Sequence, residues 1–414
     1  MVGDLIMRYL HLEFPLPLIL ALIFTAGVAV LWRFLPEGKG RRFLCGRPLC
    51  IGSTVALAVM TAIEGTWGVR MHASPGFWAV ALVMMLNLQW TLMDALKRRA
   101  PFGGIAAHAG FFLICSGAFW GAPDFVDCQL VVGEDIETLA WNRQGMAVDL
   151  PFSVSLEEFR IDYYEDGASP KQYTSVLNLD GVIKQTSVNH PCLHKGYLIY
   201  QSDYDRDGGH FSVLKAVADP WFPLILAGML LLAIGALAGL KANWRSRYLT
   251  IAVALLAILF AALSVARINF GTLVPALRSW WFVPHLVLYM IAYSALAIAL
   301  VMAVLDLAGV GNGALVPLTG KLFSTASSLL ILGMLCGAVW AKAAWGDWWT
   351  WDAKECWAGV TWLLTLCGLH LPHRMSGRKM AMLISIVLSF AAMQMAWYGV
   401  EHVPAAQTSL HAYK

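Results

Sequence analysis

Charged residues are scarce in this chain, and their scarcity excludes most soluble folds. Only 13% of the 414 residues are charged, 59% are hydrophobic, and the mean hydropathy is +0.64, whereas a soluble domain carries about 25% charged residues. The formal net charge of +3 is too small to indicate a nucleic-acid partner. The composition therefore predicts a polytopic membrane protein that contacts lipid.

Cysteine motifs are also missing. The eight cysteines form no Cys-x-x-Cys pair, so we expect neither a thioredoxin-like redox centre nor a zinc ribbon. There is no Cys-x-x-Cys-His either, which excludes the usual covalent attachment of haem to this chain. Cys128 and Cys192 lie in a segment predicted below to face the oxidising side. The sequence leaves open whether they form a disulfide.

Long apolar runs, by contrast, are abundant. Runs of about 20 apolar residues are candidate membrane spans, and we find ten: 15–34, 49–67, 77–94, 103–121, 221–240, 248–267, 283–306, 322–342, 357–371 and 380–400. The first run is too long for a signal-peptide core and is interpreted as a span. The sequence thus predicts an all-α membrane protein of about ten helices.

Basic residues in the short loops between the runs predict the orientation. The loops carry Lys39, Arg41, Arg42, Arg47, Lys97, Arg98, Arg99, Lys241, Arg245, Arg247, Arg374, Arg378 and Lys379. With ten spans these loops all lie on one side, which the positive-inside rule makes the cytoplasm. We therefore expect a cytoplasmic (inner) membrane protein, with both termini and the segment 122–220 on the extracytoplasmic side.

The segment 122–220 is the part long enough to fold in water. Stretches such as LPFSVSLEEFRIDYY and KGYLIYQSDY alternate apolar and polar residues and are rich in Val, Ile, Tyr and Phe. Gly, Asn, Asp and Pro separate them. This pattern predicts a small extracytoplasmic β domain.

Tryptophans concentrate in the segment 340–362, which reads WAKAAWGDWWTWDAKECWAGVTW and holds seven of the 18 tryptophans. In one continuous helix, Trp345, Trp348, Trp349 and Asp352 would share a face, with Trp351 and Glu355 on the neighbouring strip. Such a helix would present a flat aromatic surface at the membrane boundary. The alternative is an aromatic belt that only anchors the flanking spans.

The order of residues in this segment resembles a known signature. WGDWWTWDAKE is similar to the WWD motif, roughly WGxxWxWDxxE, of the haem-handling proteins that build c-type cytochromes. WDAKECWAGVTW looks most like the CcsA (ResC) branch. In the 122–220 segment, LPFSVSLEEFRIDYY, SPKQYTSVLNL and SVNHPCLHKGYLIYQSDY resemble the CcsB (ResB) family.

Together the two resemblances point to a fused CcsBA, the System II cytochrome c synthase. They imply an N-terminal span and loop at 1–44, a CcsB-like region at 45–244 and a CcsA-like haem-binding region at 245–414. The implied activity is a haem lyase that uses haem b as substrate and bound ligand. The implied partner is an apocytochrome c with Cys-x-x-Cys-His, with a possible extracytoplasmic thiol reductant.

Two histidines flank the tryptophan segment on the predicted outer side. His285 opens the run 283–306, and His411 lies in the C-terminal tail. Two neutral imidazoles beside aromatic rings are what axial ligation of haem iron requires. The resemblance also implies this pair, because the family's second histidine stands in an LHSY-like string that Leu410, His411, Ala412 and Tyr413 match.

Another pair lies within predicted spans. His108 and His370 are expected at similar depths near the cytoplasmic ends of their spans, and an intramembrane histidine is a functional hypothesis by default. A hydrogen bond between helices is the alternative. The resemblance implies that they ligate an inner haem, with His373 as the competing candidate. We expect ordinary surface or loop roles for the remaining histidines His11, His72, His190, His194, His210 and His402.

The expected site therefore needs no catalytic side chain, because the tryptophan segment would act by proximity. Asp352 and Glu355 could pair with Lys354 or Arg278, or could orient the helix; the sequence leaves this open. Two other functions remain possible. One is a haem exporter or carrier without lyase activity, and the other is a b-type haem protein that transfers electrons.

Overall fold

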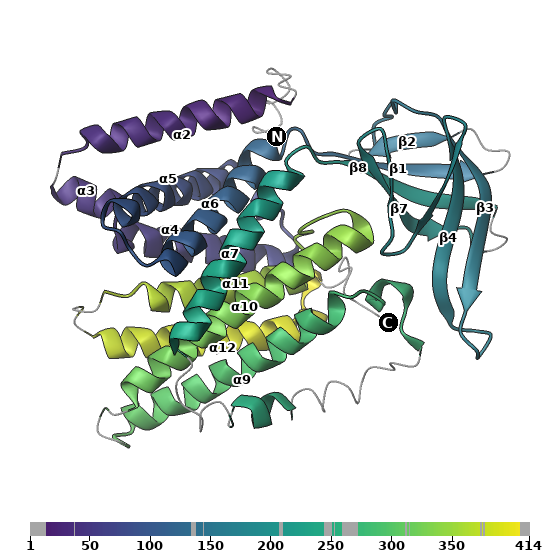
Figure 1. Ribbon diagram of the computed structural model, residues 1–414. Helices are drawn as coiled ribbons and strands as arrows, with labels where there is room; N and C mark the ends of the chain where they lie inside the picture. Colours follow the sequence, from purple (N-terminus) through teal and green to yellow (C-terminus); the bar gives the residue numbers. More distant parts are fainter. Residues whose placement is uncertain are drawn as a thin grey trace.

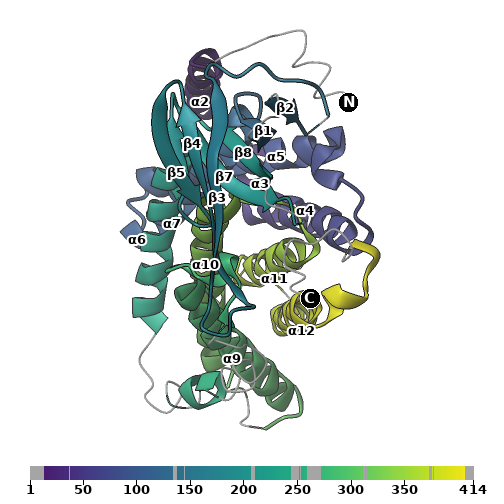
Figure 2. The same ribbon diagram turned by 90° about the vertical axis from the view of Figure 1, so that its right-hand side faces the viewer.

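The computed structural model is a bundle of long helices with a β domain at one end (Figure 1). It describes residues 14–36, 38–133, 138–143, 145–206, 210–243, 251, 253–258, 272–310, 313, 315–372, 375 and 377–405. Figure 2, turned by 90°, shows the strands in front of the helices. The predicted combination of a helical membrane part and a small β domain is confirmed.

Eight helical segments among the described residues are long and apolar enough to cross a membrane. They are α2 (Leu16–Phe34), α3 (Lys39–Leu44) with α4 (Arg47–Trp67), α5 (Pro75–Lys97), α6 (Phe102–Gly121), α7 (Phe222–Asn243), α9 (Phe282–Leu307), α10 (Val316–Trp345) and α12 (Arg378–Trp397). Each of them overlaps one of the ten predicted spans.

The other two predicted spans have different outcomes. The run 357–371 falls in α11 (Ala353–Leu369), whose 17 residues are fewer than the roughly 20 that normally cross a bilayer. The run 248–267 lies mostly outside the described residues. Short 3₁₀ turns lie between α4 and α5 (η1, Met71–Ala73), before α9 (η3, Pro275–Leu277) and after α12 (η4, Gly399–His402).

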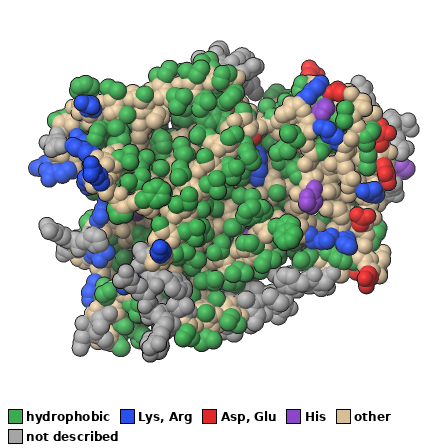
Figure 3. All heavy atoms as spheres, viewed as in Figure 1, with side chains coloured by type: hydrophobic (Ala, Val, Ile, Leu, Met, Phe, Trp, Pro, Cys, Tyr) green, Lys and Arg blue, Asp and Glu red, His purple; other side chains and the backbone are tan. Residues whose placement is uncertain are grey.

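The two longest helices, α9 and α10, supply much of the core of the bundle. Leu296 of α9, Phe323 and Leu330 of α10 and Ile386 of α12 are at most 1% exposed. Peripheral helices instead turn apolar side chains outward, as Leu22 of α2 does at 61% exposure. Figure 3 shows this hydrophobic surface over the bundle. An apolar outer face of this kind suits a lipid environment.

Basic residues gather at the end of the bundle away from the β domain (Figure 3). This end carries α3 and the junctions of α5 with α6 and of α11 with α12, with Arg41, Lys97 and Arg378 among the described residues. The β domain and the tryptophan segment lie toward the opposite end (Figure 1). The separation is the one that the ten-span scheme predicts.

The β domain consists of two antiparallel sheets. One has the strand order β2-β1-β8-β7-β6 and the other β3-β4-β5. The strands are β1 (Val126–Gly133), β2 (Leu139–Asn142), β3 (Val154–Tyr163), β4 (Pro170–Leu179), β5 (Val182–Ser187), β6 (Cys192–His194), β7 (Tyr197–Tyr204) and β8 (Phe211–Ala218). Leu130, Leu177, Ile199 and Leu214 are fully buried between the sheets. Alternating inward apolar residues form this core, as the sequence pattern predicted.

The strand register answers the open question about the two cysteines. Cys128 on β1 is opposite Ala216 on β8, Ala216 is opposite Ile199 on β7, and Ile199 is opposite Cys192 on β6. Three strand spacings of about 4.8 Å separate the two cysteines by roughly 14 Å. A disulfide needs Cα atoms within about 7 Å. Both thiols are free, so the disulfide is excluded.

Candidate functional site

The tryptophan segment is not the continuous helix that the spacing predicted. Helix α10 ends at Trp345 because Gly346 adopts a left-handed conformation with φ +86°, which favours glycine. Residues 346–352 form a connecting loop, and α11 begins at Ala353. The expected shared face of Trp345, Trp348, Trp349 and Asp352 is therefore wrong. The left-handed turn at Gly346 ends the helix, although the spacing of the tryptophans predicted that it would continue.

Asp352 and Glu355 orient the start of the second helix, which is one of the two roles that the sequence left open. Asp352 is the N-cap of α11, and its Oδ1 accepts the Glu355 backbone N–H at 2.8 Å. The Glu355 carboxylate accepts the backbone N–H of Thr350 at 2.6 Å and its hydroxyl at 2.9 Å. These bonds satisfy donors at the helix start and in the loop. The loop is thereby fixed to α11.

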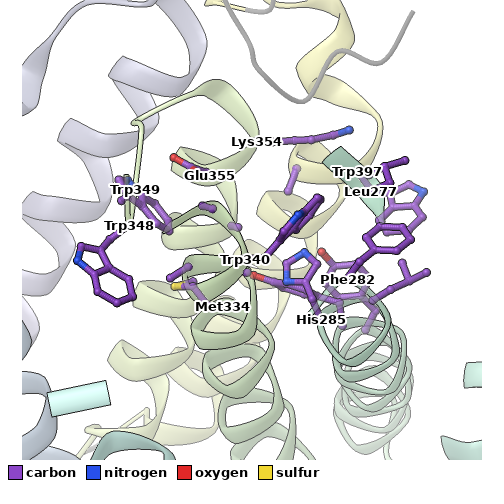
Figure 4. A pocket seen from close by; sticks show the side chains of 18 residues that line it. Leu277, Phe282, His285, Met334, Trp340, Trp348, Trp349, Lys354, Glu355 and Trp397 are labelled. Atoms are coloured by element: carbon purple, nitrogen blue, oxygen red, sulfur yellow. The ribbon is translucent and has the colours of Figure 1, made fainter. Parts of the chain in front are cut away.

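A cavity of about 260 Å³ opens where this loop meets α9, α10 and α12. Figure 4 shows Trp348, Trp349, Trp340 and His285 around it. Trp348 and Trp349 line the cavity, whereas Trp345 packs on Trp340 at 5.8 Å between ring centroids. The aromatic surface predicted from the sequence is therefore a cavity wall built from a loop and several helices.

His285 lies in this wall with a fixed ring. Its Nδ1–H donates to the carbonyl oxygen of Gly333 on α10 at 2.8 Å, which places the lone pair on Nε2 in the neutral imidazole. The ring also contacts Tyr289 at 4.8 Å and Trp340 at 5.9 Å between centroids. A Cβ at Gly337 would lie 2.7 Å from Nδ1, so only glycine admits this position of the ring. The expected partner His411 lies outside the described residues.

His108 and His370 come together as the matched depths predicted. Their ring centroids are 6.1 Å apart and the rings are nearly perpendicular at 77°. In each ring Nδ1–H donates to a carbonyl one turn earlier, to Gly104 at 2.7 Å and to Leu366 at 2.8 Å. These bonds leave the Nε2 atoms as the lone-pair positions of both neutral rings. The competing His373 lies outside the described residues.

A buried lysine that the sequence analysis did not single out links the tryptophan loop to the residue that follows the last strand of the β domain. Lys342 is 4% exposed, and its ammonium donates to Asp219 Oδ2 and to the Gly346 carbonyl, both at 3.0 Å. Asp219 also accepts from Trp348 Nε1 at 3.2 Å. A lysine within an apolar run was the signal in the sequence, because a buried charge requires a partner.

A second ion cluster joins the same two parts. Asp347 in the loop accepts from Arg143 Nη2 and from Lys215 Nζ, each at 2.6 Å. Asp127 on β1 pairs with both cations as well. These groups come from β1, β8 and the turn after β2, and they hold the loop against the β domain.

Comparisons with known proteins give two matches along the chain. Residues 98–217 match the ResB-like family, and residues 221–406 match the family described as Cytochrome C assembly protein. Three similar proteins, all named Cytochrome c biogenesis protein CcsA, come from two cyanobacteria and an alga. The protein of Prochlorococcus marinus (strain AS9601) is 33% identical over 180 residues, covering 34% of this chain and 57% of the relative.

The other two matches are of similar extent. The protein of Synechococcus sp. (strain WH7803) is 33% identical over 164 residues, covering 28% of this chain and 51% of the relative. That of Chlamydomonas reinhardtii is 32% identical over 155 residues, covering 34% and 42%. The chain therefore spans about half the length of the curated relatives it matches.

Proposed function

The chain joins a ResB-like region to a cytochrome c assembly (CcsA) region, and from this premise we propose that it delivers haem across the membrane and attaches it to apocytochrome c. The observation that carries the proposal is the cavity in which His285 meets Trp348 and Trp349. Aromatic walls suit a flat porphyrin, and a neutral imidazole suits the axial position of its iron. In this proposal His411 supplies the second outer ligand.

The cavity has further features that suit haem. Lys354 is the basic side chain in its lining and would attract a haem carboxylate. The bond from His285 Nδ1–H to Gly333 is of the kind that orients metal-binding histidines. The cavity therefore offers haem both apolar aromatic walls for the porphyrin and polar side chains for its iron and carboxylates.

The inner pair supports an earlier step in which haem is held nearer the cytoplasmic side. Two imidazoles bound to one iron through bonds of about 2 Å have ring centres roughly 6 Å apart. The separation of 6.1 Å between His108 and His370 agrees with that requirement. We propose that haem moves from this pair to the outer cavity.

Attachment needs proximity rather than a catalytic side chain. A cysteine S–H of the partner adds across a haem vinyl double bond: sulfur forms a C–S bond and the hydrogen goes to the other vinyl carbon. This addition neither oxidises nor reduces the reactants. The protein would hold haem and apocytochrome together. The partner thiols must arrive reduced, which is the role proposed for an extracytoplasmic thiol reductant.

The first experiment uses a host that expresses only this chain and a reporter apocytochrome c. His285→Ala should lower maturation roughly tenfold or more. Loss of a group that only supports a metal ligand already costs about tenfold, and loss of the ligand itself should cost at least as much. Trp348→Ala with Trp349→Ala should act similarly, and phenylalanine at both positions should be milder because it keeps a ring. His210→Ala, on the exposed surface of the β domain, is the control.

Haem content separates the two sites. His108→Ala and His370→Ala should each lower the haem content of the purified protein, and added imidazole should partly restore it. His285→Ala should leave inner haem bound. Normal maturation in His285→Ala would rule out the outer ligand. Haem binding without any maturation would favour the carrier, and quinol-driven redox turnover would favour the electron-transfer protein.

A further inference from the structure

We propose that His72, held by Glu64, is a positioning residue that fixes Trp351 and, through it, the Trp349 wall of the cavity. Both residues precede the regions that match known families, which begin at residue 98. The sequence predicted an ordinary loop role for His72. The contacts below place it against the tryptophan loop instead.

Glu64 is the first link. It lies near the end of α4 and is 3% exposed, although a buried carboxylate is costly unless it is paired. His72 donates a hydrogen bond to each of the two oxygens of this carboxylate. The backbone N–H of His72 donates to Oε2 at 3.0 Å, and the His72 ring Nδ1–H donates to Oε1. The carboxylate therefore fixes both the backbone and the ring of His72.

The His72 ring lies flat on Trp351. The ring centroids are 4.9 Å apart and the planes differ by only 8°. Phe77 of α5 meets the same indole edge-on at 5.3 Å and 87°. Two side chains from the α4–α5 region thus hold Trp351.

Trp351 requires such support because its backbone is unfavourable. Its φ of 62° lies in the left-handed region, which is unfavourable for a residue other than glycine. Trp351 immediately precedes Asp352, the N-cap of α11. Its conformation therefore decides how the loop joins that helix.

Trp349 connects this support to the cavity. Its ring meets Trp351 at 6.1 Å and 80°, and it lines the cavity. A Cβ at Gly359 of α11 would lie 3.5 Å from the Trp349 ring, so the indole rests on the helix that Asp352 caps. The contacts run without a break from Glu64 through His72 and Trp351 to the cavity wall.

The test measures amide hydrogen exchange in the purified full-length protein. The amide of Thr350, which donates to Glu355 at 2.6 Å, reports whether the loop keeps its place. His72→Ala alone leaves a buried unpaired carboxylate and can fail to fold, so it is combined with Glu64→Met. We expect Thr350 to exchange roughly tenfold faster in this double variant.

A conservative pair provides the rescue. His72→Phe with Glu64→Met keeps a ring on Trp351 without a buried charge, and should restore slow exchange at Thr350. The matched control is a second histidine–carboxylate pair among the described residues, His194 and Asp180 at 2.9 Å in the β domain. His194→Ala with Asp180→Asn should leave exchange at Thr350 unchanged. Unchanged exchange in the alanine variant, or equal exchange in the alanine and phenylalanine variants, would overturn the proposal.

The effect on haem rests on the proposed function, and a second readout separates the two. Reporter maturation should fall in the alanine variant and recover in the phenylalanine variant. Faster exchange with unchanged maturation would keep His72 as the support of Trp351 and would count against the proposed role of the cavity. Unchanged exchange rejects the positioning role whatever maturation does.

Discussion

At the scale of single residues, the position of His285 depends on one missing methyl group. The ring lies where a Cβ on Gly337 would come within 2.7 Å of Nδ1 and 2.8 Å of Cε1. Real Cβ atoms do not approach so closely, so a side chain at this position would push the ring away from the carbonyl of Gly333 to which it donates. The sequence around His285 contains no hint of this constraint, because it comes from another helix.

Gly337→Ala should therefore displace His285 while leaving the rest of α10 intact. Because His285 is the proposed outer haem ligand, we expect reporter maturation to fall by roughly tenfold, the loss typical of a disturbed contact that supports such a ligand. The control on the same helix is Gly320→Ala, because no atom lies within 4 Å of the Cβ position there. Equal maturation in both variants would contradict the prediction.

A second residue-scale prediction concerns Cys128, which is 1% exposed. Burial, together with nearby Asp127, raises the pKa of its thiol from 9.0 to about 11. At pH 8 only on the order of one thiol in a thousand would be ionised. Iodoacetamide should leave Cys128 unmodified in the folded protein. The more accessible Cys192 should react first.

The raised pKa also fixes the direction of the pH effect on stability. The unfolded thiol ionises near pH 9 and the folded thiol near pH 11, so the contribution of Cys128 is fully present below pH 9 and is lost as pH rises toward 11. After unfolding without reductant, both β-domain thiols should become labelled. Failure to label them would mean a disulfide and would contradict the strand register.

At the scale of secondary-structure elements, apolar length was the most informative property of the sequence. Long uninterrupted runs predicted ten spans, and eight of them correspond to long apolar helices among the described residues. Alternation of apolar and polar residues predicted the β domain, because either pattern extends along a whole element. The tryptophan segment was different. One glycine, Gly346, ended a helix that the spacing of Trp345 and Trp349 would have continued.

The site was predictable only in part for the same reason. The sequence singled out His108, His370 and His285, because a histidine in or beside an apolar run is conspicuous. Their neighbours could not be predicted. Gly337 and Lys354 become part of the cavity only when α9, α10 and α11 pack together, and His72 contacts Trp351 across 279 positions of the chain.

The start of α11 gives an element-scale prediction. Asp352→Ala removes the N-cap acceptor for the Glu355 N–H and should destabilise the protein by about 1 kcal/mol. Asp352→Asn keeps an acceptor at the cap and should have a much smaller effect. Thermal unfolding in detergent measures both. Equal loss of stability in the two variants would show that capping is not what Asp352 contributes.

At the scale of the whole molecule, the two ends of the bundle differ in charge. Basic side chains gather at the end away from the β domain (Figure 3), and such residues stay on the cytoplasmic side of a membrane. We therefore propose that the β domain and the cavity face the extracytoplasmic side. Haem would then travel from the basic end toward the β domain.

Fusions with alkaline phosphatase, which is active only outside the cytoplasm, test this orientation. A fusion at the turn before β5, at Gly181, should be active. A fusion at Arg99, in the turn after α5, should be inactive. The reverse pattern would invert the proposed route of haem.

The ion cluster between the β domain and the tryptophan loop also limits how the chain can evolve. Losing one member, such as Lys215, would leave Asp347 paired with Arg143 alone, and a largely buried carboxylate that loses one of its partners is destabilising. A lineage that altered one partner would thus be expected to alter the other. Substitutions at Lys215 and Asp347 should therefore occur together among related proteins. The two positions are 132 residues apart and lie on opposite sides of the boundary between the ResB-like and assembly regions.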